Sequence, residues 1–211
     1  MKISTALKAL AGAAVVMLPL TATAESTLST GAAALSSSAK VDFQVTIPKI
    51  LYLRVGNGSS YTTGVLTTGG TIDLVTFSPA AAVVGNGSAV TGAGGDLTGG
   101  VSTAAIISNS GNVTLNATAT GALGNATGDS IAFTQITTTA SALTGGYTLL
   151  PAPVLANGVS ANVVLTAPGT KVITADAKWT YAYANTPTPP AGTYGGVNTN
   201  NSRVTYTATM P

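Results

Sequence analysis

The sequence predicts an all-β fold, and three observations lead to that expectation. Over residues 173–183, apolar or small side chains alternate with polar ones, which is the period of a half-buried strand. Shorter runs of the same kind recur along the chain, separated by turn dipeptides such as Gly69-Gly70 and Asn157-Gly158. No later segment has a credible helical period. Strands at this spacing favour an antiparallel sandwich or barrel.

The C-terminal region, residues 171–211, is the clearest part of the pattern and holds the single tryptophan of the chain. Trp179, Tyr181 and Tyr183 fall on one face of the predicted strand, so we expect them in the core rather than on a sugar-binding surface. Tyr52, Tyr61 and Tyr194 lie outside such a pattern and are the better surface candidates. After a turn-rich stretch, alternation returns over residues 204–210 and predicts a last strand.

The other expected strands can be placed in chain order. Residues 40–47 alternate cleanly, and Pro48 separates them from a second run at 51–55, which fits an edge strand or a crossing between sheets. Further strands are expected at 64–68, 71–78, 101–108, 112–120, 130–139, 146–150 and 159–166, and residues 80–100 are expected to form a long loop. The 101–108 and 112–120 runs flank a three-residue turn and predict a hairpin. The turn signals indicate about nine to eleven strands.

Residues 1–24 have the form of an export signal. Lys2 and Lys8 precede an apolar run, and residues 22–24 read Ala-Thr-Ala, a cleavage site before Glu25. The run is shorter than the roughly 20 residues that a bilayer span needs. We therefore predict a signal peptide at 1–24, a flexible leader at 25–38 and a single β-sandwich domain at 39–211. The mature chain is expected to be exported, without membrane insertion after signal removal.

Charge excludes several classes of partner. Without Lys2 and Lys8, six cations face six carboxylates, and charged residues make up only 7% of the chain. Such a chain offers neither the basic surface of a nucleic-acid-binding protein nor a polybasic membrane patch. A net charge near zero also gives little repulsion against self-association. Because the chain contains no cysteine, its stability must come from a core instead of disulfides.

The residues for most catalytic and metal chemistry are missing from the sequence. The chain contains neither histidine nor cysteine, which removes most general bases, thiol nucleophiles and zinc or haem sites. A Ser-x-x-Lys match at Ser37 and Lys40 has no partner motif and is expected by chance. The aspartates are scattered and predict neither a glycosidase pair nor a calcium site. We expect no enzyme activity, no cofactor and no metal.

The two ends of the chain resemble a known family. Residues 39–48 read AKVDFQVTIP, residues 189–196 read PPAGTYGG, and residues 203–208 read RVTYTA. These stretches resemble the fimbrial subunits of bacterial surface fibres, and most of all the alternative, class 5 group of chaperone–usher pilins. The resemblance covers about fifty residues at the termini.

The resemblance implies an immunoglobulin-like, two-sheet antiparallel sandwich that is incomplete and is filled by the N-terminal strand of a neighbour. The matching donor side chains are Val41, Phe43, Val45 and Ile47. It also implies a non-catalytic structural or adhesive subunit at a bacterial cell surface, reached through the periplasm. The partners would be copies of itself, homologous subunits or a periplasmic chaperone. The alternative is a secreted module that binds polysaccharide or matrix, with a glycan as its ligand. Whether residues 40–47 pair within one chain or between chains stays open.

Overall fold

The computed structural model describes residues 25–56 and 65–211. The chain divides into two units, Met1–Ile47 and Pro48–Pro211, and all the strands of the described residues lie in the second. The predicted signal peptide and Tyr61 lie outside the described residues. None of the helices in this part of the chain is long and apolar enough to cross a membrane.

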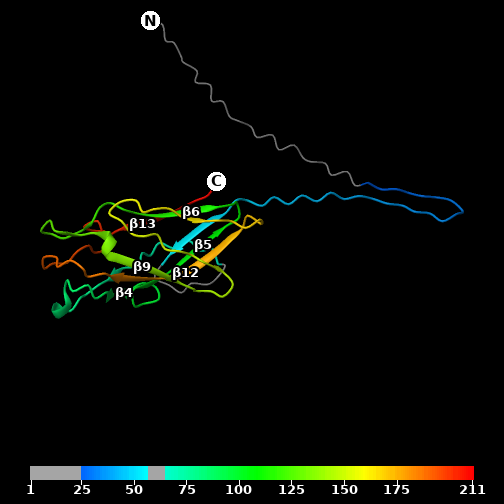
Figure 1. The fold of residues 1–211 in the computed structure, drawn as a ribbon. Coiled ribbons are helices and arrows are strands. Elements are labelled where there is room, and N and C mark those ends of the chain that lie inside the picture. The colour runs from blue at the N-terminus through cyan, green and yellow to red at the C-terminus, as the bar shows by residue number, and fades with distance from the viewer. Residues whose placement is uncertain (1–24, 57–64) are drawn as a thin grey trace, which may run out of the picture. The chain divides into compact units, whose positions relative to one another are not determined.

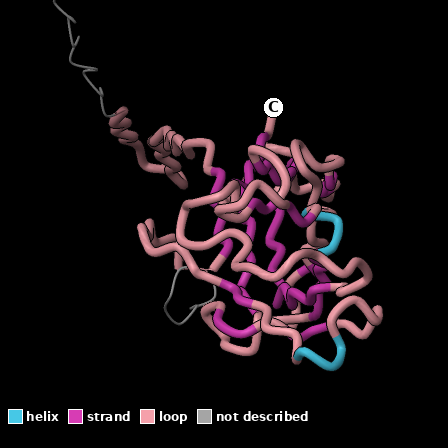
Figure 2. Tube along the Cα trace, turned by 90° about the vertical axis from the view of Figure 1, so that its left-hand side faces the viewer, coloured by secondary structure: helices cyan, strands magenta, loops and turns pink. Residues whose placement is uncertain are grey.

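The second unit is built almost entirely from strands and loops, which confirms the all-β prediction. Helical structure in the described residues is confined to two short 3-10 turns, η1 (Ala81–Val83) and η2 (Phe133–Gln135), as Figure 2 shows in cyan. The strands are β1 (Leu51–Val55), β2 (Val75–Thr76), β3 (Val90–Thr91), β4 (Ala93–Gly94), β5 (Val101–Ser108), β6 (Val113–Ala119), β7 (Leu123–Gly124), β8 (Ser130–Ile131), β9 (Ile136–Ser141), β10 (Thr148–Leu149), β11 (Val163–Leu165), β12 (Ile173–Tyr183) and β13 (Val204–Thr209). Several have only two residues, which is why the turn signals undercounted them.

Two sheets contain all the long strands. In the large sheet, β12 pairs with β5 along one side and with β10 and β9 along the other, while β1 pairs with β5 and β3 with the end of β12. The small sheet has the order β11-β6-β13. In Figure 1, β6 and β13 lie on one side and β5, β12 and β9 on the other. The arrangement is consistent with a β-sandwich.

The core lies where these two sheets meet. It combines buried side chains of β12 and β5 with those of β6, including Ile106, Leu115 and Val113. Trp179 is completely buried, and its indole N–H donates a hydrogen bond of 3.0 Å to the carbonyl oxygen of Leu150. The prediction that the aromatic face of residues 173–183 forms core is confirmed, because Tyr181 and Tyr183 are also buried.

Several local predictions are wrong. Residues 65–68 form no strand, and the strand expected at 130–139 is divided into β8, η2 and β9. Residues 40–47 form no strand, although their alternation is clean. A strand is stable only when a neighbouring strand forms hydrogen bonds with its backbone N–H and C=O groups. Alternation of side chains does not provide such a neighbour. The predicted hairpin is also absent, because β5 and β6 belong to different sheets. β5 already has β1 and β12 on its two sides, so its hydrogen-bonding edges are occupied and the chain crosses to the other sheet.

The expected loop at 80–100 contains short strands and is ordered by one buried side chain. Asn185 is fully buried and has a left-handed backbone with φ of 56°. Its amide nitrogen donates to the carbonyl oxygens of Val83 and Ser88, and its amide oxygen accepts from the N–H of Gly85. An asparagine tolerates this backbone conformation better than most residues. The loop is therefore fastened to the end of β12.

Candidate interface for strand addition

A groove lies between the large sheet and the small sheet, at the C-terminal half of β1 and the start of β13. Among the described residues, β1 pairs only with β5 and β13 only with β6, so each of them is an edge strand there. The two strands lie next to each other. At one end of the two strands, the Lys49 ammonium donates to the main-chain oxygen of Pro211 at 3.0 Å. At the other end, Val55 and Val204 both line the opening. An edge strand with unpaired backbone groups can accept another strand.

The groove contains two connected hollows. The shallower one, about 360 Å³, lies directly between β1 and β13 and is lined by Leu53 and Tyr206 among others. The larger one, about 930 Å³, continues past the start of β13. Its wall includes Phe77, Tyr183 and Tyr194, and it shares Val55, Val204 and Tyr206 with the first. Each hollow falls within the size range of binding sites, and the larger one has a mainly apolar lining.

The inner faces of the two edge strands are not fully covered. Along β6, every core-facing residue is buried, whereas the core-facing Val204, Tyr206 and Ala208 of β13 are only half-buried. The same holds for Leu51, Leu53 and Val55 of β1. Cross-strand neighbours of these residues are completely buried, for example Ile106 opposite Leu53. The core is therefore complete in its centre and incomplete along the groove.

Two tyrosines contribute a pair of hydroxyl groups to the groove wall. The hydroxyl groups of Tyr181 and Tyr206 are 3.1 Å apart, and the Tyr206 ring packs on Trp179 with centroids 5.3 Å apart. Burial raises the pKa of Tyr206 to about 12. Burial also raises the pKa of Tyr181 well above its usual value, with a further contribution from Tyr206. Both hydroxyls are therefore protonated at neutral pH, and these two side chains add no charge to the wall.

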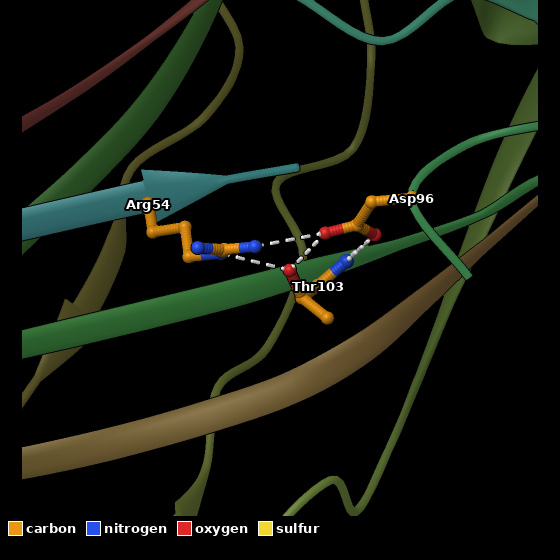
Figure 3. A network of polar contacts seen from close by, with 3 residues as sticks. All are labelled: Arg54, Asp96 and Thr103. Atoms are coloured by element: carbon orange, nitrogen blue, oxygen red, sulfur yellow. Dashed lines mark hydrogen bonds and ion pairs between the residues drawn. The ribbon is translucent and has the colours of Figure 1, made fainter. Parts of the chain in front are cut away.

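A buried ion pair fixes the chain at the end of β1. The Arg54 guanidinium donates to Asp96 at 3.2 Å and to the Thr103 hydroxyl at 2.9 Å, as Figure 3 shows. Asp96 also accepts from the Thr103 backbone N–H at 2.7 Å and from the Thr103 hydroxyl. The Arg54 and Asp96 side chains are 5% and 0% exposed. The network holds the loop at Asp96 against β1 and β5, and so it sets the position of one wall of the groove.

The predicted donor side chains lie in the first unit. Val41, Phe43, Val45 and Ile47 are 72%, 90%, 83% and 76% exposed. Four large apolar side chains at every second position are thus open to water, and they gain free energy when they find an apolar surface. The leader before them bends back on itself, since the Thr27 hydroxyl donates to the carbonyl oxygen of Ser38.

A second exposed apolar stretch borders the groove. Val65, Leu66, Ile72 and Leu74 are 45–62% exposed, and Ile72 lines both hollows. The sequence pattern assigned this region to ordinary strands, but only β2 forms there. The sequence does show that this stretch is rich in apolar residues beside glycines at 69 and 70. These residues have no clear period, so the sequence does not indicate which side of the stretch would be buried.

Comparison of the chain with protein families, with curated proteins and with solved structures finds no match. Among residues 25–56 and 65–211, no group of three or more histidine, cysteine, aspartate or glutamate side chains is placed to hold a metal ion. The groove is therefore the main feature from which a function can be argued.

Proposed function

We propose that the protein is a non-catalytic, exported subunit of a bacterial surface fibre, which assembles by strand addition. The N-terminal segment of one copy (residues 40–47) lies in the groove between β1 and β13 of the next copy. In this account the large and small sheets are the two layers of an immunoglobulin-like sandwich that lacks one strand. The incoming segment supplies that strand.

The observation that carries the proposal is that one chain has both an open groove and an exposed apolar segment. The groove has two hydrogen-bonding edges and a half-buried apolar lining. The segment has four exposed apolar side chains on one face of an extended chain. Eight residues of strand span about 26 Å, which suits the length of β13 with its flanking residues.

The free energy available is large enough for a durable fibre. Burial of Val41, Phe43, Val45 and Ile47 contributes roughly 1.5–3 kcal/mol each, or about 6–12 kcal/mol in all before ordering costs. Backbone hydrogen bonds to the edge strand that the segment joins add to this, because an unpaired buried N–H or C=O is costly. Strand addition uses both terms together.

A second candidate function has one observation in its favour. The larger hollow is lined by Phe77, Tyr183 and Tyr194, and aromatic rings are suitable surfaces for sugar rings. A secreted module that binds polysaccharide or matrix would stay monomeric. It would bind glycan in a groove that no segment of a second copy fills. A fibre subunit needs no ligand and polymerises with itself.

Electron microscopy of cells that express the protein tests the proposal. The wild-type protein should form surface fibres, and a variant with Phe43→Asp and Val45→Asp should be exported without forming them. A Val41→Ile variant, which keeps the apolar face, is the matched control and should form fibres as the wild type does. Export of a monomer that stays monomeric at high concentration, with no fibres on the cells, would contradict it.

A further inference from the structure

The large sheet has another free edge, far along the sheet from β1, and it is formed by β9. β9 has six residues and, within residues 25–56 and 65–211, pairs only with β12. Outside the groove, the other edge strands of the two main sheets in the described part of the chain, β3, β10 and β11, have two or three residues. Short edges protect a sheet against unwanted pairing, and β9 lacks that protection.

β9 also lacks the other usual protections. Its sequence is Ile-Thr-Thr-Thr-Ala-Ser, with no proline and no charged residue. Thr137, Thr139 and Ser141 are exposed and lie on the outer face, whereas Ile136, Thr138 and Ala140 face the core. Lysines and prolines are the residues that proteins place on edges to prevent association.

The register shows which backbone groups are open. Ala184 donates its N–H to the carbonyl oxygen of Gln135, so these two residues form a hydrogen-bonded pair. Hydrogen-bonded and non-hydrogen-bonded pairs alternate in an antiparallel ladder. Thr137, Thr139 and Ser141 therefore direct their N–H and C=O groups to β12. Those of Thr138 and Ala140 point to the open side, and the backbone hydrogen bonds found among the described residues do not engage them there.

We infer that β9 is a self-association edge, which pairs antiparallel with β9 of a second copy about a two-fold axis at Thr139. In this arrangement Thr138 of each copy lies opposite Ala140 of the other, and the two pairs exchange four backbone hydrogen bonds. The same surface of both copies meets at a two-fold interface, so that surface must be complementary to itself. The β9 edge meets this condition, because its open N–H and C=O groups pair with those of a second β9. The inference is independent of the groove and would join neighbouring fibres side by side.

The outer side chains fit the same axis. The Thr139 side chains of the two copies meet at a non-hydrogen-bonded pair, where side chains lie closest, and threonine pairs at such positions are favourable. Thr137 of each copy lies opposite Ser141 of the other, so every outer contact joins small hydroxyl side chains. Lys178 is the exposed cation nearest to this row, next to Ser141. The antiparallel arrangement places the two copies of Lys178 at opposite ends of the interface, where they do not repel.

Charge reversal at the axis tests the inference. The exported protein carries Phe43→Asp and Val45→Asp in all samples, so that strand addition does not contribute, and its association is measured by sedimentation equilibrium. Thr139→Lys and Thr139→Glu should each weaken dimerisation at least tenfold, because like charges lie directly opposite. An equal mixture of the two variants should restore dimerisation, which a merely structural effect of either substitution would not do.

Two further variants complete the experiment. Thr138→Pro removes an open-side N–H while the ladder to β12 stays intact, and it should also abolish the dimer. Thr207→Lys, on the exposed face of β13, should leave it unchanged. Circular dichroism melts confirm that each variant is folded. A monomeric parent protein at millimolar concentration, or a Thr139→Lys variant that dimerises as well as its parent, would overturn the inference, whatever becomes of the groove.

Discussion

The hydroxyl groups of Tyr181 and Tyr206 lie 3.1 Å apart, one on the central strand β12 of the large sheet and the other on the edge strand β13 of the small sheet. The contact joins the two sheets at the wall of the groove. Burial raises the pKa of both phenols, that of Tyr206 to about 12. Burial disfavours the charged form of a side chain, so an ionised phenolate at this position would be destabilising.

The protein should therefore lose stability at alkaline pH. In the unfolded chain a tyrosine releases its proton near pH 10, whereas folded Tyr206 keeps it to about pH 12. Between these pH values the folded state binds more protons than the unfolded state. The contribution of Tyr206 to the free energy of unfolding is therefore fully present below about pH 10 and is lost as the pH rises toward 12. The slope is at most about 1.4 kcal/mol per pH unit for each tyrosine. Urea unfolding from pH 8 to 12 measures this decline, and Tyr206→Phe should flatten it.

Replacement of the central tryptophan should destabilise the fold severely. Trp179 has no exposed surface and donates its indole N–H to Leu150. Trp179→Ala should cost about 3–5 kcal/mol, against a typical total of 5–15 kcal/mol for a domain. Trp179→Phe fills part of the space and should cost less. Denaturant unfolding of the secreted protein gives both values, and equal stability of Trp179→Ala and wild type would refute the assignment of this ring to the core.

The carboxylate of the buried ion pair should be just as important. Asp96→Ala removes the group that accepts hydrogen bonds from Arg54 and Thr103, and it leaves a buried cation without this compensation. The expected loss is about 3–5 kcal/mol. The control is Glu25→Ala, which removes the exposed partner of Lys40 and should produce no measurable change. A loss for Asp96→Ala no larger than that for Glu25→Ala would show that the network does not hold the wall of the groove.

Export should remove the first 24 residues. The Ala22-Thr23-Ala24 site precedes Glu25, and small residues at these positions are what signal peptidase requires. Mass spectrometry of the exported protein should give a mass that starts at Glu25. A retained Met1 would overturn the compartment that the fibre proposal needs.

The sequence predicted the strands whose side chains fill the core. β12 at residues 173–183 and β5 at 101–108 have the expected boundaries, because local alternation marks the first and flanking turn residues mark the second. Trp179 was assigned to the core from spacing alone. These properties are local, so they can be read without knowing which strands pair.

Which strands pair with one another could not be predicted from local alternation. The turn after β5 has the spacing of a hairpin, but the edges of β5 are taken by β1 and β12, which lie far away in the sequence. The groove likewise depends on β1 and β13, which come from opposite ends of the domain. Residues 40–47 alternate as a strand should, and yet no strand forms there. Alternation reports a face that can be buried, and it does not report what buries it.

The measurement that tests strand addition most directly is the binding of a peptide of residues 39–48 to the isolated unit Pro48–Pro211. The account predicts a tight complex of one peptide with one protein, accompanied by a change in Trp179 fluorescence, since Tyr206 of the groove packs on that ring. A peptide with Phe43→Asp and Val45→Asp should bind at least about a hundredfold more weakly, which corresponds to a loss of about 2.7 kcal/mol. Absence of binding by the wild-type peptide, or equal binding of the two peptides, would contradict the central claim.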